Sequence, residues 1–257
     1  MKLLIAILLL APGLAAEEEK IKPPTPGEIQ IPDPGTTIED PAVAKQEVTR
    51  FLGGMKETEG DEKGVELLIR LGGWDHPDIL NAASKYVRDK REKIAVAAVI
   101  ACARQSTNKD KAGSILAKSL NREKRTTVTC ALIVGMGRLS YDKKTVHKAV
   151  VKIFRKDTSE THKAAARYLG YIRDKKAFKM LAERLDEPKN TLPPQGRKKM
   201  PIPSEAEKRR KWEEWKSAFP SIQWALSQLV LGETFESMDE AREWALTEGK
   251  KHGISWA

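Results

Sequence analysis

The sequence predicts an all-α fold, an α-solenoid of helical hairpins that ends in a tryptophan-containing C-terminal helical cap. Three observations support this prediction. From Asp40 onward, apolar residues recur with helical spacing. A pattern of two apolar helices around a polar turn then repeats every 32 to 34 residues, as the turns at Asn108, Asp142 and Asp174 show. After the last repeat, three of the six tryptophans lie close together in the chain.

The composition restricts the class of protein. The chain has 257 residues, of which 40% are hydrophobic and 32% are charged, so it is neither wholly disordered nor a multi-span membrane protein. Its length can hold one sizeable core or two small ones. Two cysteines cannot form a disulfide framework, and four histidines leave little for a histidine-rich metal site.

Residues 1–16 are predicted to be a signal peptide. Lys2 provides a short positive start, residues 3–10 are continuously apolar, and the small residues up to Ala16 suit a signal peptidase. The alternatives, a buried helix or a membrane anchor, fit less well because a span needs roughly 18 to 20 apolar residues. We therefore expect cleavage near Ala15 or Ala16, a soluble periplasmic or extracellular product and no transmembrane span.

Residues 17–40 are predicted to be a proline-rich arm that is disordered or extended. Prolines remove backbone donors and favour extended neighbours, so a helix cannot run through this segment. An edge strand at residues 28–32 is the alternative, but it has no obvious pairing partner. The five prolines in question are Pro23, Pro24, Pro26, Pro32 and Pro34.

Residues 41–188 are predicted to form the repeat domain. Four helical hairpins are expected between about residues 61 and 187, and the first of them is a weaker copy that turns at Asp75, 33 residues before Asn108. An Asp at the start of a turn can cap the following helix, which explains the recurring Asp75, Asp142 and Asp174. One hairpin buries too little surface alone, so stacking is expected. The positions expected to be buried are Ala97, Ile100, Leu116, Ala131, Val134, Val150, Ala165, Leu169 and Leu181.

Two regions of the sequence, one in the repeats and one near the C-terminus, carry a family resemblance. The helix Arg167-Tyr-Leu-Gly-Tyr-Ile, followed by Asp174-Lys-Lys-Ala, resembles the HEAT repeats, and in particular the short HEAT-like class; the likeness covers roughly residues 60–187. The stretches Gln223-Trp-Ala-Leu, Leu231-Gly-Glu-Thr-Phe and Asp239-Glu-Ala-Arg-Glu-Trp are similar to the ending of many exported bacterial HEAT-repeat proteins. The resemblance implies a solenoid without a catalytic set, and it implies little about function because such repeats hold many roles.

Residues 189–204 are predicted to be a proline-rich basic loop, and residues 205–257 a C-terminal helical cap. A loop of this length is either functional or a plain linker. Trp212 and Trp215 lie one helical turn apart, and Trp224 follows. We expect these tryptophans to seal the last repeat, with an exposed ligand platform as the alternative.

Charge is unevenly distributed along the chain. The net charge is −7 over residues 17–87, +12 over 88–163, +7 over 164–216 and −3 over 217–257. A basic centre attracts polyanions, although lysines that only solvate helix faces would give the same count. The candidate anion- or partner-binding residues are Arg197, Lys198, Lys199, Lys208, Arg209, Arg210 and Lys211, beside Trp212 and Trp215. Four glutamates near this cluster in the sequence neutralise only part of its positive charge.

Catalytic and metal-binding patterns are not evident in the sequence. It contains no nucleophile elbow, P-loop, dinucleotide fingerprint, zinc-protease motif or EF-hand loop. His147 and His162 lack accompanying ligands, so no metal and no cofactor are expected. Cys102 and Cys130 are offset along neighbouring helices, beyond the reach of a disulfide, and are expected to be buried thiols.

The sequence therefore predicts an exported non-enzymatic HEAT-repeat scaffold that binds another protein. The alternative is a polyanion-binding module that recognises nucleic acid, acidic polysaccharide or an anionic surface through the basic centre and residues 196–211. A third possibility is an enzyme on a HEAT-like scaffold, because alkylpurine DNA glycosylases and phycobilin lyases resemble this architecture. Export argues against both of those enzymatic roles.

Overall fold

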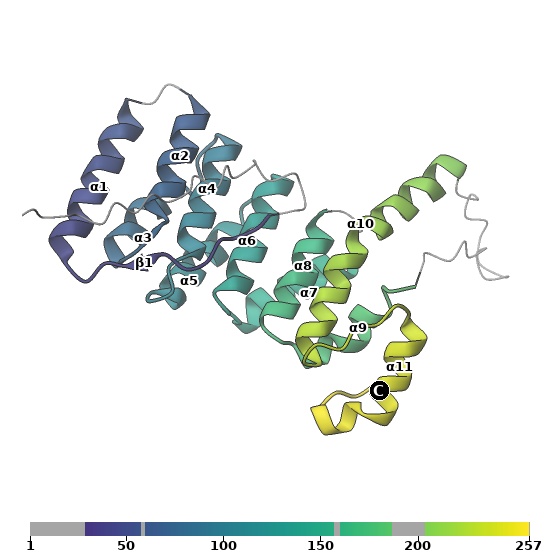
Figure 1. Ribbon diagram of the computed structural model, residues 1–257. Coiled ribbons are helices and arrows are strands. Elements are labelled where there is room, and N and C mark those ends of the chain that lie inside the picture. The colour runs from purple at the N-terminus through teal and green to yellow at the C-terminus, as the bar shows by residue number, and fades with distance from the viewer. Residues whose placement is uncertain (1–28, 58–59, 157–159, 187–203, 257) are drawn as a thin grey trace, which may run out of the picture.

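The computed structural model describes residues 29–57, 60–156, 160–186 and 204–256, and these residues form an all-α fold (Figure 1). Within them lie eleven α-helices, two short 3-10 helices and one pair of two-residue strands. The segment predicted to be a signal peptide and the basic loop up to residue 203 lie outside the described residues.

The helices follow the predicted order of hairpins. Helices α2, α4, α6, α8 and α10 contact one another in sequence order, and we call them the central row (Figure 1). The second helix of each hairpin, such as α3, α5 and α7, packs beside the row. The helices are α1 Pro41–Lys56, α2 Asp61–Leu71, α3 Pro77–Ser84, α4 Glu92–Ala103, α5 Lys109–Leu120, α6 Thr126–Arg138, α7 Lys144–Lys156, α8 Glu160–Tyr171, η1 Lys175–Ala177, α9 Phe178–Ala182, α10 Glu205–Leu229, α11 Met238–Thr247 and η2 Gly249–His252.

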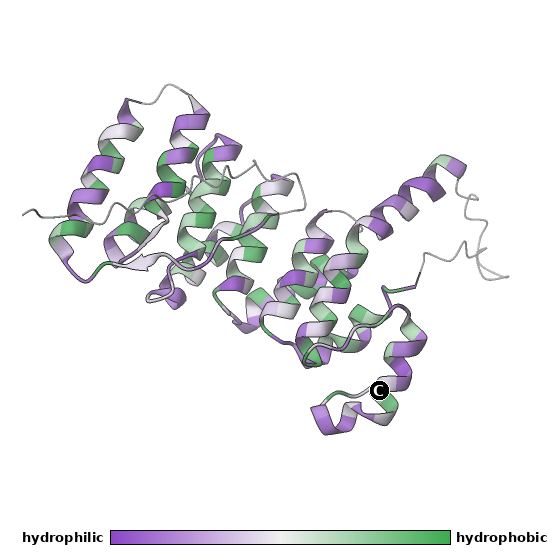
Figure 2. Cartoon of the chain, in the orientation of Figure 1, coloured by the Kyte–Doolittle hydropathy of each residue, from purple (hydrophilic) through white to green (hydrophobic). Residues whose placement is uncertain are grey.

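The core lies along the central row. Helices α4 and α6 are apolar almost all round, because each is covered by its neighbours in the row and by the helix that precedes it in the chain, α3 for α4 and α5 for α6 (Figure 2). The positions expected to be buried are buried, with one exception. Ile100 is partly exposed and packs against the core from its margin. The start of α10, by contrast, is largely hydrophilic (Figure 2).

The turn aspartates do not all cap helices as expected. Asp174 accepts a hydrogen bond from the backbone N of Lys176 (3.1 Å) and caps the 3-10 helix η1. Asp75 does not cap α3, because its buried carboxylate accepts from the Ser106 hydroxyl (2.6 Å) and from the hydroxyl and backbone N of Thr107. His76 provides the α3 cap instead. Asp75 therefore joins the turns of neighbouring hairpins.

The arm predicted over residues 17–40 to be disordered or extended is extended in its described part, from Ile29 onward. Ile29, Ile31 and Ile38 are buried against the helices. Strand β1, Thr36–Thr37, pairs in parallel with β2, Trp74–Asp75. A short edge strand thus forms a few residues later than the one considered from the sequence. The sequence did not reveal it, because its partner β2 is only two residues long and carries no strand pattern.

No helix in the described part of the chain is both long and apolar enough to cross a membrane.

Candidate functional site

The predicted cationic cluster is only partly described by the structure. Arg197, Lys198 and Lys199 lie outside the described residues, whereas Lys208–Lys211 lie in the first half of α10. This helix begins where the sequence predicted it, because the Ser204 hydroxyl accepts from the backbone N of Glu207 (3.2 Å). The structure therefore places four of the seven predicted cations on one exposed helix.

Most of these cations are paired within α10. Lys208 contacts Glu205 (2.6 Å), Arg210 contacts Glu214 (2.6 Å) and Lys211 contacts Glu207 (3.4 Å), each at helical i,i+3 or i,i+4 spacing. Exposed pairs of this kind contribute little stability and remain open to exchange with another anion. Arg209 makes no such pair among the described residues.

The two predicted tryptophans have different environments. Trp215 is anchored, because its indole Nε1 donates to the carbonyl oxygen of Arg184 (3.2 Å) and its ring packs on Phe219. Trp212 is 38% exposed, and the Lys216 ammonium lies 4.8 Å from its ring centroid. Of the two, Trp212 is therefore the one available to a ligand.

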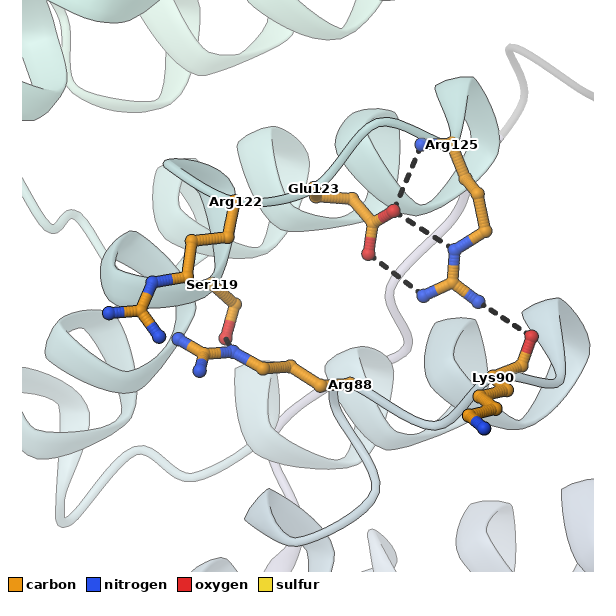
Figure 3. A pocket seen from close by; sticks show the side chains of 6 residues that line it. All are labelled: Arg88, Lys90, Ser119, Arg122, Glu123 and Arg125. Carbon is orange, nitrogen blue, oxygen red and sulfur yellow. Dashed lines mark hydrogen bonds and ion pairs between the residues drawn. The ribbon is translucent and has the colours of Figure 1, made fainter.

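A second group of cations lies around a cleft between two hairpin connections. This cationic cleft was not predicted from the sequence. The cleft has a volume of about 370 Å³ and is lined by Arg88, Lys90, Ser119, Arg122, Glu123 and Arg125 (Figure 3). These residues belong to the connection from α3 to α4 and to the end of α5 with its connection to α6. The signal that could have revealed the site is the repeated run Arg-acid-Lys-Arg at residues 88–91 and 122–125.

Each run folds into the same local structure. Asp89 accepts from the backbone N of Arg91 (2.9 Å) and from its Nε (3.0 Å) and Nη2 (2.9 Å). Glu123 accepts from the same three donors of Arg125 at 2.9, 2.9 and 2.8 Å. These bonds lower the pKa of both carboxyls, that of Glu123 to about 2. Each acid is therefore ionised and neutralised by the arginine two residues later.

The two connections are also joined to each other. The Arg125 Nη1 donates to the carbonyl oxygens of Asp89 (2.9 Å) and Lys90 (3.1 Å). Arg88 donates through Nε to the Ser119 hydroxyl (3.3 Å) and through Nη2 to the carbonyl oxygen of Lys118 (3.0 Å). The walls of the cleft are thus held by side-chain contacts about one repeat apart in sequence.

A third basic feature lies at the other ends of α4 and α6. Three arginines, Arg104, Arg138 and Arg167, contact the extended N-terminal segment, and we call them the arginine face. The Arg104 Nε donates to the carbonyl oxygen of Asp33 (2.7 Å), and the Arg167 Nη1 to that of Ile29 (3.1 Å). The Arg138 Nη2 pairs with the Asp33 carboxylate (2.8 Å), whose side chain is almost fully exposed. Burial lowers the pKa of Arg104.

The backbone of this segment makes further contacts. The Gly35 N–H donates to the carbonyl oxygen of Arg104 (3.1 Å), Thr36 to Gly73 (2.8 Å) and Ile38 to Asp75 (3.2 Å). A Cβ on Gly35 would lie 2.8 Å from the backbone carbon of Trp74, so only glycine allows this approach. The segment is therefore fitted to the helices along its length (Figure 1).

The two histidines and two cysteines considered in the sequence have the following surroundings in the structure. The His147 ring bonds to Asp174 (2.8 Å), and the His162 ring stacks on Phe154. No group of metal-ligating side chains occurs among the described residues. Cys102 and Cys130 are buried and not joined in a disulfide, as expected, and burial raises the pKa of the Cys102 thiol to about 12.

Comparison of the chain with protein-family models, with curated proteins and with solved structures gives no match.

Proposed function

We propose that the protein is an exported, non-enzymatic scaffold of the HEAT-like kind, in which the helix row forms a solenoid and the arginine face binds an extended segment of a partner protein. The observation that carries this proposal is intramolecular. The chain lays its own residues 29–38 across the ends of α4, α6 and the side of α8, with backbone and side-chain contacts along the segment. A surface that holds one extended segment has the chemistry to hold another.

The contacts indicate what such a partner segment contains. Arg104 and Arg167 donate to backbone carbonyl oxygens, which every extended chain presents. The buried Ile29 and Ile31 stand two residues apart, so alternate apolar side chains are favoured. The three arginines favour a nearby carboxylate, as Asp33 provides here. The partner is therefore an extended apolar segment with a negative charge.

We further infer that the C-terminal residues seal the open end of the helix row, as a cap does in a solenoid. Trp224 packs on Tyr171 of α8, with ring centroids 4.8 Å apart. The rings of Trp244 and Trp256 lie 5.7 and 6.4 Å from that of Phe178. These contacts cover the α8 and α9 side of the row with aromatic surface.

The test uses a labelled peptide with the sequence of residues 29–39. In the wild-type protein the internal segment competes, so binding is expected to be weak. In the Gly35→Ala protein, where the added Cβ loosens the internal segment, the peptide should bind about tenfold more tightly. Adding Arg104→Gln should remove most of this gain, whereas Arg209→Gln in α10 should leave it unchanged.

A peptide of the same composition in reversed order is the specificity control. If it binds as well as the natural sequence, or if Arg104→Gln has no effect on binding, the arginine face does not recognise extended segments. Fluorescence anisotropy at fixed ionic strength measures all of these affinities.

Polyanion binding is the second candidate function, favoured by the exposed Arg209 and the exchangeable ion pairs at the start of α10. Binding to heparin or DNA should then weaken steeply with salt. Replacing Lys198, Lys199, Arg209 and Arg210 by Glu should abolish it without changing the helix content. Equal binding of parent and variant at low salt would exclude these residues as the polyanion site.

A further inference from the structure

The cleft between the hairpin connections contains more positive charge than its own acids neutralise. Glu123 and Arg125 cancel each other as a bidentate pair. Arg88, Lys90 and Arg122 remain, and Lys90 and Arg122 make no side-chain hydrogen bond or ion pair with any described residue. The lining of the cleft therefore carries a net charge of three positive units.

The two arginines are placed to act together. Figure 3 shows the guanidinium groups of Arg88 and Arg122 turned to the same side of the cleft, next to Ser119, with the Glu123–Arg125 pair on the other side. Arg88 is held by its bonds to Ser119 and Lys118 and still has N–H groups that these bonds do not use. Arg88 is thus held in place before a ligand binds, and Arg122 is available to move toward the ligand.

We propose that this cleft binds a phosphate or sulfate group between the Arg88 and Arg122 guanidiniums. Two neighbouring guanidinium groups repel each other, and a doubly charged tetrahedral oxyanion removes this repulsion while accepting hydrogen bonds from both planar forks. A cleft of about 370 Å³ has room for such a group and for part of the molecule that carries it. Glu123, already fully engaged by Arg125, keeps the cleft wall in place.

The site goes beyond the proposed peptide-binding function and is separate from it. Arg88 and Arg122 precede α4 and α6, whereas Arg104 and Arg138 lie at the far ends of the same helices. A helix of this length spans about 18 Å, so the two sets of arginines act on different ligands. Loss of one kind of binding therefore leaves the other measurable.

The experiment is calorimetric titration of the full-length protein with inorganic phosphate, inorganic sulfate, phenyl phosphate and acetate, at an ionic strength held constant with chloride. We expect phosphate and sulfate to bind and acetate, a monoanion, to bind at least about tenfold more weakly. Inorganic phosphate binding much more tightly than phenyl phosphate supports a free ion as ligand. Comparable binding of phenyl phosphate supports a phosphate group carried by a larger molecule.

The decisive variant is Arg122→Gln, which removes a side chain with no described partner and so should leave the melting temperature unchanged. Phosphate affinity should fall about tenfold or more, with Arg122→Lys intermediate because an ammonium lacks the planar fork. Lys124→Gln is the matched control, since Lys124 stands in the same connection but does not line the cleft. Phosphate binding no stronger than acetate binding, or an equal loss in Arg122→Gln and Lys124→Gln, would overturn the proposal.

Discussion

At the scale of single residues, the cations of this basic chain differ in whether an acidic side chain close in sequence pairs with them. On α10 the pairs follow helical spacing, so they can be predicted from sequence once the helix is known. In the hairpin connections the pairs Asp89–Arg91 and Glu123–Arg125 join residues only two apart, which requires a particular turn of the backbone. For this reason the sequence located the α10 cations but not the Arg88–Arg122 cleft.

The fully buried Leu169 provides a test of the core. Its side chain is 0% exposed on α8, between α6 and α10 in the central row. Leu169→Ala should lower the free energy of unfolding by about 2 to 5 kcal/mol, because it removes methyl groups and leaves a cavity. Urea denaturation measures this free energy. The control is Leu246→Ala, which should have little effect because Leu246 is 66% exposed. A neutral Leu169→Ala would place Leu169 outside the packed core.

The Glu123–Arg125 pair should give a pH-dependent contribution to stability. The contacts with Arg125 lower the pKa of Glu123 from its ordinary value of 4.5 to about 2 in the folded protein, so folding favours the ionised form. This contribution is complete above the unfolded-state pKa and is lost as the pH falls through the folded-state pKa. Glu123→Gln should therefore cost about 2 kcal/mol at pH 7 and clearly less at pH 3.

Urea denaturation at both pH values tests this dependence, with the exposed Glu233→Gln as the matched control. An equal loss of stability at pH 7 and pH 3 would show that Glu123 acts through shape and not through its charge.

At the scale of elements, the helices could be predicted because each hairpin repeats the same apolar period. The turns at Asn108 and Asp174 fall directly before α5 and η1, as the repeat requires. The sheet could not be predicted, because β1 and β2 have two residues each and pair across nearly forty residues of chain. The buried Asp75 was likewise misassigned, since its partners Ser106 and Thr107 belong to the next hairpin.

The extended segment depends on the absence of a side chain at Gly35. Gly35→Ala should detach residues 29–38 from the helices, because the added Cβ meets backbone atoms that cannot move aside. Hydrogen exchange of the Thr36 and Ile38 N–H groups, which donate to Gly73 and Asp75, should become faster. In Gly53→Ala, where the Cβ meets nothing within 4 Å, exchange at these groups should stay slow. Unchanged protection in Gly35→Ala would show that the segment tolerates the added carbon.

At the scale of the whole molecule, repetition places equivalent residues in register. Arg88 and Arg122 are one repeat apart, and so are Arg104 and Arg138 at the opposite ends of α4 and α6. The same repetition limits contacts, because each helix of the central row packs on the helices before and after it (Figure 1). A local loss of packing at one end of the row therefore reaches the other end through the helices between, and through residues 29–38, which contact α4, α6 and α8.

Two glycine variants at opposite ends of the row test whether each helix is stabilised mainly by its neighbours. A Cβ at Gly72 would lie 2.7 Å from the Ala101 Cα, where α2 meets α4, and one at Gly170 would lie 2.9 Å from the Ala225 Cα, where α8 meets α10. Gly72→Val should loosen the N-terminal end and Gly170→Val the C-terminal end. Nearest-neighbour stabilisation predicts that each variant speeds hydrogen exchange in its own half and leaves the far half protected. If either variant accelerates exchange evenly from α2 to α10, the row unfolds as one cooperative unit and the proposed solenoid behaviour is wrong.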